Sequence, residues 1–482
     1  MVFSSLVFIS LFLPLTLACY YLVPRFLRNT VLLLASLLFY AWGETFYVVI
    51  MLISIAMNYV FGLAVSRLRG RPAATSAVAI AVFFNLGLLG VFKYANFIVD
   101  NINACLGGWL IPAIELQPVH LPIGISFFTF QALSYVLDVH RQDARAQHNP
   151  LRLALYVALF PQLIAGPIVR YQHIEDQISA RKTSVEMIAR GIRRFLIGLA
   201  KKVLLANTFA FPADEIFNLP ADALTASVAW FGVICYTLQI YFDFSGYSDM
   251  AIGLGRMFGF EFRENFQWPY VSKSIREFWR RWHISLSTWF RDYLYIPLGG
   301  NQRGALRTYL NLLIVFFLCG LWHGASWTFV FWGLYHGLFL VLERTRFSRF
   351  LEVLPAPMRH GYVLVVVAGG WVLFRAETLE QAINFYKAMM GIPGANPWPE
   401  LLWRYLRGDI LIAFAAGLIG ATPFLPKLRG WVRDWQERSV RWVPYRMATV
   451  GTVSVSAYLL LLVGCVMSLV AGTHNPFIYF RF

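Results

Sequence analysis

The stretch Gly320-Leu321-Trp322-His323-Gly324-Ala325-Ser326-Trp327 sets a histidine between glycines and tryptophans, and it separates two apolar runs at 309–322 and 327–342. Runs that approach about 20 apolar residues span a bilayer as helices, so the pattern predicts a membrane-embedded helical hairpin. An ionisable side chain at such a place is costly and is a candidate functional residue by default. We expect His323 to act as a general base. A histidine that only hydrogen-bonds between helices would give the same pattern.

The composition predicts a polytopic membrane protein. Of the 482 residues, 58% are hydrophobic and only 14% are charged, whereas soluble domains carry about 25% charged residues. The net charge is +16, but the basic residues fall between apolar runs, as the positive-inside rule requires. We therefore expect contact with membrane lipid and no nucleic-acid partner. The five cysteines are far apart and form no metal-ligand spacing, so we expect neither disulfides nor a metal site.

Basic clusters orient about eleven or twelve spans, with both termini outside, in one membrane-embedded domain over residues 1–482. The first apolar run, 6–23, has no basic residue before it and is expected to be a retained helix. The run 151–169 has arginines at both ends and two internal prolines, which predicts a re-entrant element. Such broken backbone survives at membrane depth only inside protein or beside a cavity, so it indicates a chamber. Residues 243–307 should form a cytoplasmic-side interfacial segment.

A second histidine, His283, lies in an amphipathic stretch at 275–295. On a continuous helix, Arg276, Arg280, His283 and Ser287 would share one face, with Trp279 and Trp282 elsewhere. Arginines on such a face bind a polyphosphorylated ligand or anchor the helix to anionic lipid. His283 is the second candidate for the catalytic site.

Two further motifs favour structural interpretations. In Tyr241–Asp249 the acids Asp243 and Asp249 could orient an imidazole, but Ser248 or Asp249 capping a helix that starts at Met250 is the preferred interpretation. His336 lies within the second run of the hairpin, where packing or hydrogen bonding between helices is expected.

With these residues identified, the chain resembles the membrane-bound O-acyltransferase (MBOAT) superfamily over essentially its full length. Residues 278–287 (FWRRWHISLS) resemble the upstream histidine motif of that superfamily, and Leu321–Gly324 resembles its catalytic histidine motif. The similarity is greatest to the bacterial alginate O-acetyltransferase subgroup. The two histidine motifs are specific to the superfamily, and the segments that indicate the subgroup are less specific. The similarity to the subgroup rests on the segments Met1–Ser5, Phe39–Trp42, Leu121–Phe127, Ala165–Arg170, Phe374–Ala376 and Pro476–Phe482.

The resemblance implies an all-α polytopic fold, a ring of tilted transmembrane helices around a central chamber with re-entrant and interfacial helices. It implies acetyl-CoA as cytoplasmic donor substrate, no permanently bound cofactor, and O-acetylation of an exopolysaccharide, with alginate first. A periplasmic partner acyltransferase of the SGNH type and polysaccharide biosynthesis machinery would complete the reaction at the bacterial inner membrane. His323 would be the base or a transient acyl carrier, and His283 would position the donor thioester or tune the pocket. Arg276, Arg280, Trp279 and Trp282 are the expected donor-binding residues.

Several alternatives stay open from the sequence. The acceptor could be cellulose or peptidoglycan, and D-alanyl transfer proteins share both histidine motifs but use a carrier protein as donor. A non-catalytic transporter or flippase also suits broken spans and intramembrane polar groups. The missing internal repeat weighs against it. Cleavage of the donor thioester separates the transporter from the enzyme.

Overall fold

The computed structural model describes residues 1–107, 112–392, 401–438 and 443–472. The closing segment Pro476–Phe482 and parts of the expected loops at 377–409 and 427–446 lie outside the described residues. All regular secondary structure within the described ranges is helical, as the fold class predicted.

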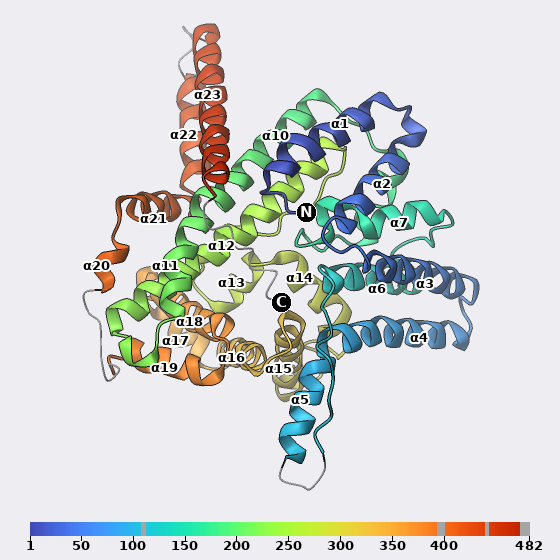
Figure 1. Cartoon of the computed structure of the whole chain (residues 1–482), viewed down its shortest axis with the longest axis horizontal. Helices are drawn as coiled ribbons and strands as arrows, with labels where there is room; N and C mark the ends of the chain where they lie inside the picture. The colour runs from blue at the N-terminus through green and yellow to red at the C-terminus, as the bar shows by residue number, and fades with distance from the viewer. Residues whose placement is uncertain (108–111, 393–400, 439–442, 473–482) are drawn as a thin grey trace.

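The helices form a ring around shorter inner helices (Figure 1). The larger helices are α1 (Leu13–Leu22), α2 (Arg28–Ala41), α3 (Val48–Arg67), α4 (Pro72–Leu89), α5 (Ala95–Leu106), α6 (Ile125–Arg141), α7 (Pro150–Ala158), α10 (Val185–Ala200), α11 (Asn207–Phe217), α12 (Ala226–Met257), α15 (Gly304–His323), α16 (Trp327–Leu342), α18 (Ala356–Arg375), α19 (Leu379–Met389), α21 (Gly408–Gly420), α22 (Phe424–Arg438) and α23 (Val443–Val470). Inside the ring lie α13 (Ile275–Arg281) and α14 (Ile284–Phe290).

Six helical segments of the described chain are long and apolar enough to cross a membrane, or seven if the bent pair α21 and α22 is one span. They include α3, α15 and α18, and also the continuous segments Pro72–Leu106 and Val185–Phe217. Helices Phe8–Leu22 and Trp327–Leu342 are apolar but shorter. The protein is therefore a multi-pass membrane protein, and the expected total of eleven or twelve spans stays a prediction.

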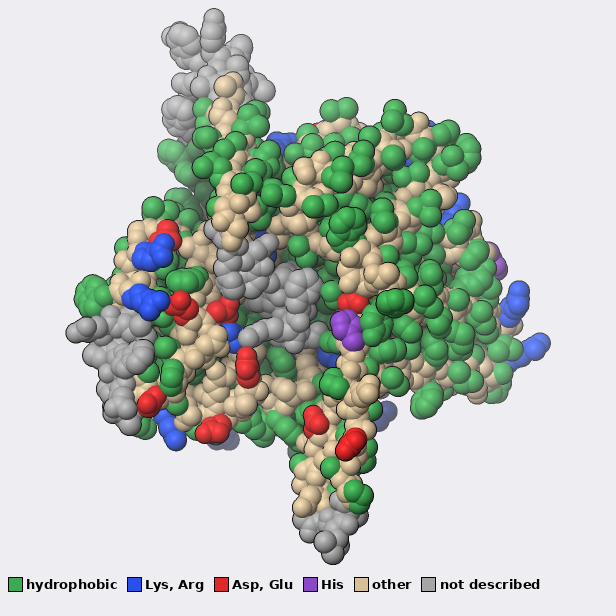
Figure 2. Space-filling view, in the orientation of Figure 1, with side chains coloured by type: hydrophobic (Ala, Val, Ile, Leu, Met, Phe, Trp, Pro, Cys, Tyr) green, Lys and Arg blue, Asp and Glu red, His purple; other side chains and the backbone are tan. Residues whose placement is uncertain are grey.

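The surface supports this placement. Hydrophobic side chains cover most of the upper and right parts of the face in Figure 2, and charged side chains gather over its left and lower parts. Many large apolar side chains are exposed along the outer helices, including Phe83, Leu34 and Leu338. Because lipid replaces water around such helices, their exposure carries no solvation penalty.

The expected re-entrant run is a broken helix. Helix α7 ends at Ala158, the backbone leaves the helical region at Leu159, and the short α8 (Phe160–Leu163) follows. Residues 155–170 are buried throughout. The break and the burial agree with the interpretation from the prolines, and the side on which the chain returns stays a prediction.

The expected boundary at residue 243 is wrong. Helix α12 begins behind the N-cap Thr225 and runs without interruption through the acidic motif to Met257. No helix starts at Met250, so the preferred capping interpretation of Ser248 and Asp249 is also wrong. The reason is tertiary: α12 packs closely against α10 and the π-helical turn η5 (Lys201–Ala206), whose cations neutralise its acids.

Small residues and ion pairs make that packing possible. A Cβ on Gly198 would lie 2.5 Å from the carbonyl oxygen of Gly246, so only glycine permits this approach of α10 and α12. Lys202 pairs with Asp243 at 2.8 Å, and Lys201 pairs with Asp249 at 2.7 Å. The carboxylates of Asp243 and Asp249 therefore hold α12 against η5 in the ring of helices.

Candidate functional site

His323 is the last residue of α15, and it lies at the turn between α15 and α16. Its imidazole is walled by aromatic rings from three helices, with centroid distances of 4.9 Å to Trp322, 5.0 Å to Trp332 and 5.2 Å to Phe374. The residue is only 5% exposed. The expected hairpin and the buried histidine are both present.

Glycines bring α15 and α16 together at this turn. A Cβ on Gly320 would collide with the carbonyl oxygen of Phe329, and one on Gly333 would collide with that of Phe316. The two backbones therefore pack directly against each other. This contact fixes the end of α15, and with it the imidazole.

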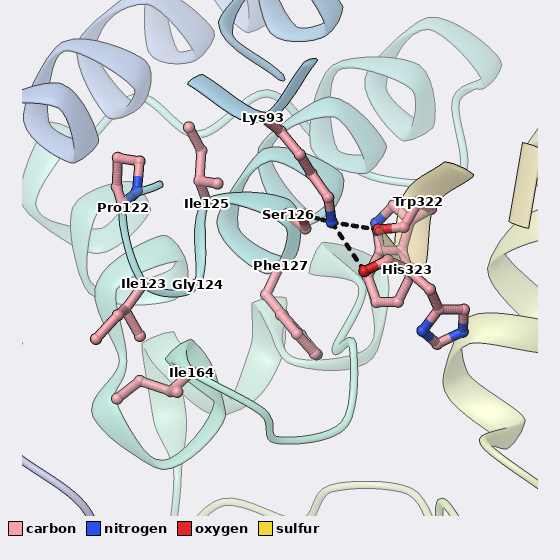
Figure 3. Close-up of a pocket in the computed structure, with 10 residues that line it drawn as sticks. All are labelled: Lys93, Pro122, Ile123, Gly124, Ile125, Ser126, Phe127, Ile164, Trp322 and His323. Atoms are coloured by element: carbon pink, nitrogen blue, oxygen red, sulfur yellow. Dashed lines mark hydrogen bonds between the residues drawn. The ribbon is translucent and has the colours of Figure 1, made fainter. Parts of the chain in front are cut away.

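A lysine and a tyrosine hold the same end of α15 from the side. The amino group of Lys93 donates to the Trp322 carbonyl at 2.5 Å and to the His323 carbonyl at 3.3 Å, and the Tyr94 hydroxyl donates to the Leu321 carbonyl at 2.7 Å. These are three consecutive carbonyls that the helix leaves without intrahelical donors. Figure 3 shows the Lys93 bonds, with the His323 imidazole directed away from the lysine.

Both residues come from the π-helical turn η3 (Gly90–Tyr94), which joins α4 to α5. Short π-helical turns inside α-helices occur frequently at functional sites. A cavity of about 20 Å³ lies beside Lys93 and is lined also by residues 122–127, Ile164, Trp322 and His323. Sequence reasoning missed Lys93, although a lysine within the apolar segment 72–106 is a signal that could have identified it.

His283 lies inside the ring, not on an arginine-bearing helix face. The expected continuous helix over 275–295 is wrong, because it breaks between α13 and α14, where His283 has a left-handed backbone with φ of +42°. The break turns His283 inward, and it is only 1% exposed. Burial lowers the pKa of His283 to about 3, so the ring is neutral at ordinary pH.

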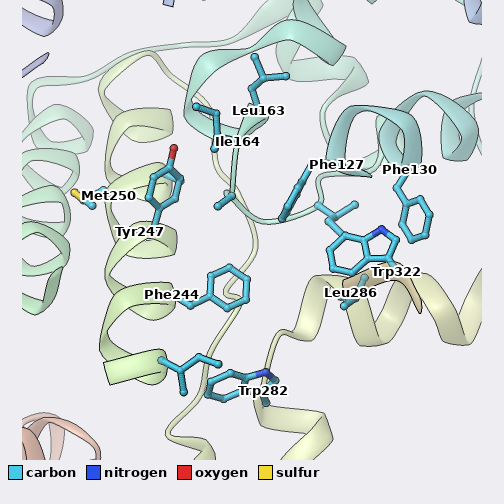
Figure 4. Packing of buried hydrophobic residues seen from close by; sticks show 14 of the residues in the cluster. Phe127, Phe130, Leu163, Ile164, Phe244, Tyr247, Met250, Trp282, Leu286 and Trp322 are labelled. Atoms are coloured by element: carbon cyan, nitrogen blue, oxygen red, sulfur yellow. The ribbon is translucent and has the colours of Figure 1, made fainter. Parts of the chain in front are cut away.

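The two histidines share one aromatic chamber. The ring of Trp322 lies 6.2 Å from that of His283 and 4.9 Å from that of His323, and the imidazoles are close enough to interact electrostatically. Phe127 and Phe130 also pack against Trp322, each at 5.5 Å. Figure 4 shows Phe127, Phe130 and Trp322 in one buried cluster with Phe244, Trp282 and Leu286.

A larger cavity of about 380 Å³ opens between α13–α14 and the α15–α16 hairpin. Arg276, Trp279 and Arg280 line it, as does Cys319, one helical turn before His323. Three of the four expected donor-binding residues therefore share one cavity. Trp282 does not line it and packs instead against Phe278 at 5.6 Å and Trp371 at 4.9 Å.

A carboxylate that sequence reasoning missed fixes this cavity wall. Glu343, which follows α16 and is 5% exposed, accepts hydrogen bonds from the backbone N–H groups of Ile275 (2.5 Å) and Arg276 (2.9 Å) and from the Tyr362 hydroxyl (3.2 Å). A negative charge at the first N–H groups of a helix is stabilising. Glu343 thus couples α13 to the hairpin that carries His323, and no local sequence pattern indicates this long-range contact.

The remaining candidates are structural. His336 is fully buried and packs between Trp279 at 5.1 Å and Trp332 at 5.3 Å. Across the described ranges, no group of three or more His, Cys, Asp or Glu side chains could hold a metal ion.

The helical ring, the two buried imidazoles in one aromatic chamber and the neighbouring arginine-lined cavity define a polytopic membrane protein with a buried candidate site. Residues 116–368 match the model of the MBOAT, membrane-bound O-acyltransferase family. The chain is 42% identical to the probable alginate O-acetylase AlgI of Pseudomonas putida, over the full length of both. It is 36% identical to the peptidoglycan O-acetyltransferase of Helicobacter pylori, over 82% of this chain and 81% of that protein. It is 31% identical to the teichoic acid D-alanyltransferase of Bacillus subtilis, over 46% and 60%.

The chain belongs to the membrane-bound O-acyltransferase family, and it is an O-acyltransferase. The family assignment made from the two histidine motifs is confirmed.

Proposed function

We propose that this protein takes an acetyl group from cytoplasmic acetyl-CoA and transfers it across the bacterial inner membrane for O-acetylation of an exopolysaccharide, alginate. A single observation carries the proposal: the end of α15 separates the arginine-lined cavity from the Lys93 cavity. Cys319 lines the first cavity, and Trp322 and His323 line the second. This arrangement supports a role for His323 between a donor from one side and an acceptor from the other. The whole chain, residues 1–482, would act as a single domain.

The donor side suits coenzyme A. Arg276, Arg280, Arg291 and Arg344 line the larger cavity and are exposed at its mouth. Guanidinium groups bind phosphates well because their N–H groups match the spacing of phosphate oxygens. Trp279 and Leu286 provide an apolar wall for the pantetheine arm. No bound cofactor is needed in this scheme, since acetyl-CoA is a substrate.

His323 would act as general base. Its imidazole takes the proton of the acceptor hydroxyl while the hydroxyl oxygen bonds to the acetyl carbon. The C–S bond then breaks, and the leaving thiolate takes the proton from the imidazolium. Because the thioester already activates the acetyl group, the site mainly needs to hold both reactants in line. His283 would position the donor, and a periplasmic acyltransferase of the SGNH type would carry the acetyl group to the polymer.

Alginate is proposed as acceptor because the P. putida relative is similar over its whole length. The peptidoglycan O-acetyltransferase relative makes peptidoglycan the second candidate acceptor. Mass spectrometry of both polymers from a deletion strain and its complemented parent separates them. Loss of acetyl groups from alginate alone is the expected result, and loss from peptidoglycan alone would replace the proposed acceptor.

The experiment on the chemistry uses purified protein in lipid vesicles with labelled acetyl-CoA. His323→Ala should abolish thioester cleavage, and His140→Ala, which removes an exposed histidine at the end of α6, should leave it unchanged. Undiminished cleavage by the folded His323→Ala protein would reject the base assignment. Failure of the wild-type protein to cleave the thioester would favour a transporter or a carrier-protein donor.

A further inference from the structure

Asn265, in the segment between α12 and α13, is fully buried and forms hydrogen bonds with His283 and the two residues after it. Its side-chain oxygen accepts from the Ser285 backbone N–H at 3.1 Å and from the Ser285 hydroxyl at 2.9 Å, and it lies 3.2 Å from His283 Nδ1. Its backbone oxygen accepts from the Ile284 N–H at 2.9 Å. Its side-chain nitrogen donates to the Ser248 hydroxyl at 3.1 Å.

These contacts determine which histidine nitrogen carries the proton. A backbone N–H is only a donor, so its bond to the Asn265 side chain identifies the contacted atom as the amide oxygen. An amide oxygen is only an acceptor. The Ser285 hydroxyl also lies 3.4 Å from His283 Nδ1, but its one hydrogen goes to the Asn265 oxygen at 2.9 Å, so Nδ1 is the donor to that oxygen. A neutral imidazole has one N–H, which leaves Nε2 as a bare lone pair.

That lone pair is buried and has no hydrogen-bond partner among the described residues. Its surroundings are aromatic: Phe244 lies edge-on at 4.5 Å, and Trp322 lies at 6.2 Å. A buried acceptor without a donor is costly, and such groups in native proteins usually have a functional reason. The left-handed backbone of His283 is a second cost, and it is the contacts of Asn265 to the next two residues that hold it.

The missing donor is expected from the substrate. Ile284, the residue after His283, and Leu286 line the arginine-bearing cavity, so His283 is a sequence neighbour of the residues along the expected path of the donor. The pantetheine arm next to the thioester carries amide N–H groups, whereas the thioester oxygen is itself an acceptor and cannot bond to a bare nitrogen.

We propose that Asn265 is a positioning residue that locks His283 in the Nδ1-protonated tautomer, so that Nε2 accepts a hydrogen bond from a pantetheine amide N–H. The proposal rests on acetyl-CoA being the donor. It separates the two histidines by role: His283 holds the donor, and His323 handles the proton of the acceptor.

The tautomer is measured by ¹⁵N solid-state NMR on histidine-labelled protein in bilayers, because protonated and bare imidazole nitrogens have well-separated shifts. The His283 signals are those lost in His283→Gln. We expect a protonated Nδ1 and a bare Nε2 in the full-length protein without substrate, and a shift of the Nε2 signal when acetyl-CoA is added. A protonated Nε2 in the substrate-free protein would overturn the inference whether or not the enzyme is active.

Variants of Asn265 provide a kinetic arm. Asn265→Leu keeps the volume but loses every polar contact, so His283 should show mixed tautomers and the KM for acetyl-CoA should rise about tenfold. Asn265→Asp keeps the accepting oxygens and should restore the tautomer and most of the KM. Asn85→Ala, which removes another fully buried asparagine, from the α3–α4 contact, should leave the His283 signals unchanged.

Each result has a distinct meaning. If Asn265→Leu keeps the Nδ1-protonated tautomer, or if the KM does not change, Asn265 has no positioning role. If Asn265→Leu does not accumulate, the wild-type spectrum and Asn265→Asp still decide the tautomer. If the wild-type protein shows the expected tautomer but does not cleave acetyl-CoA, the donor assignment fails and the locked tautomer stands.

Discussion

Replacing Lys93 by methionine tests whether the lysine sets the position of the catalytic imidazole. Lys93 donates to the carbonyls of Trp322 and His323 at 2.5 and 3.3 Å. Each bond contributes on the order of 1–3 kcal/mol, depending on the charge of the donor. Methionine is similarly long and fills irregular space well, so the cavity wall is kept while the bonds to the two carbonyls, and a weaker one to the Ser126 hydroxyl at 3.3 Å, are lost.

The loss should affect catalysis more than stability. Removing a buried amino group relieves its desolvation, which offsets part of the lost bonding. The end of α15, however, is left with two carbonyls without donors and can shift by a fraction of an ångström or more. Because a misplacement of about 1 Å can lower the rate about 100-fold, we expect kcat to fall between about 10- and 100-fold with little change in melting temperature.

The assay is acetyl-CoA turnover by purified protein in lipid vesicles, with melting followed in parallel. Tyr94→Phe removes only the bond to Leu321 and should lower kcat about fivefold, since it loses about 1 kcal/mol. Lys182→Met, at an exposed site, is the matched control and should behave as wild type. A Lys93→Met protein with normal kcat and normal melting would refute the positioning role.

Three further changes test the rest of the site. Arg280→Ala should raise the KM for acetyl-CoA about tenfold with kcat unchanged, because one charge-assisted phosphate contact is lost. An unchanged KM at low salt would exclude this arginine from donor binding. Glu343→Gln replaces one carboxylate oxygen by an NH2 group, so at least one of the three groups that donate to Glu343 loses its acceptor, at a cost of about 1–3 kcal/mol. The melting temperature should therefore fall by a few degrees, and the KM for acetyl-CoA should rise. Equal melting curves would show that α13 is held by other contacts. Gly333→Ala places a methyl group in the close α15–α16 contact, which should destabilise the protein by about 1–3 kcal/mol and reduce its accumulation and melting temperature. Gly361→Ala, at a site with open space around it, should leave both unchanged. Normal accumulation of Gly333→Ala would contradict the close packing of the hairpin.

The features that follow from local patterns were predictable. The apolar runs and the charge distribution indicated an all-helical multi-pass protein, and the isolated His323 marked the turn between α15 and α16. The prolines in 151–169 indicated the break between α7 and α8. Each of these signals lies within a few residues of the structure it specifies.

The features that depend on contacts between distant segments were not predictable. Periodicity over 275–295 indicated one helix, but the contacts of Asn265 hold His283 in a left-handed backbone and break it. The motif with Asp243 and Asp249 indicated a helix boundary before Met250. Cations on α10 and η5 pair with these two acids instead, and α12 continues through them. Glu343 is likewise defined only by its partners on α13 and α18.

The proposed function requires one imidazole to serve a donor on one face of the membrane and an acceptor on the other. The most direct measurement uses sealed inside-out inner-membrane vesicles from the producing bacterium, which contain the partner proteins and expose their cytoplasmic face. Labelled acetyl-CoA added outside cannot cross the bilayer. We expect O-acetyl label on glycan in the vesicle lumen with the wild-type protein and none with His323→Ala at equal protein levels. Equal luminal label with His323→Ala, or label confined to the outer medium, would contradict it.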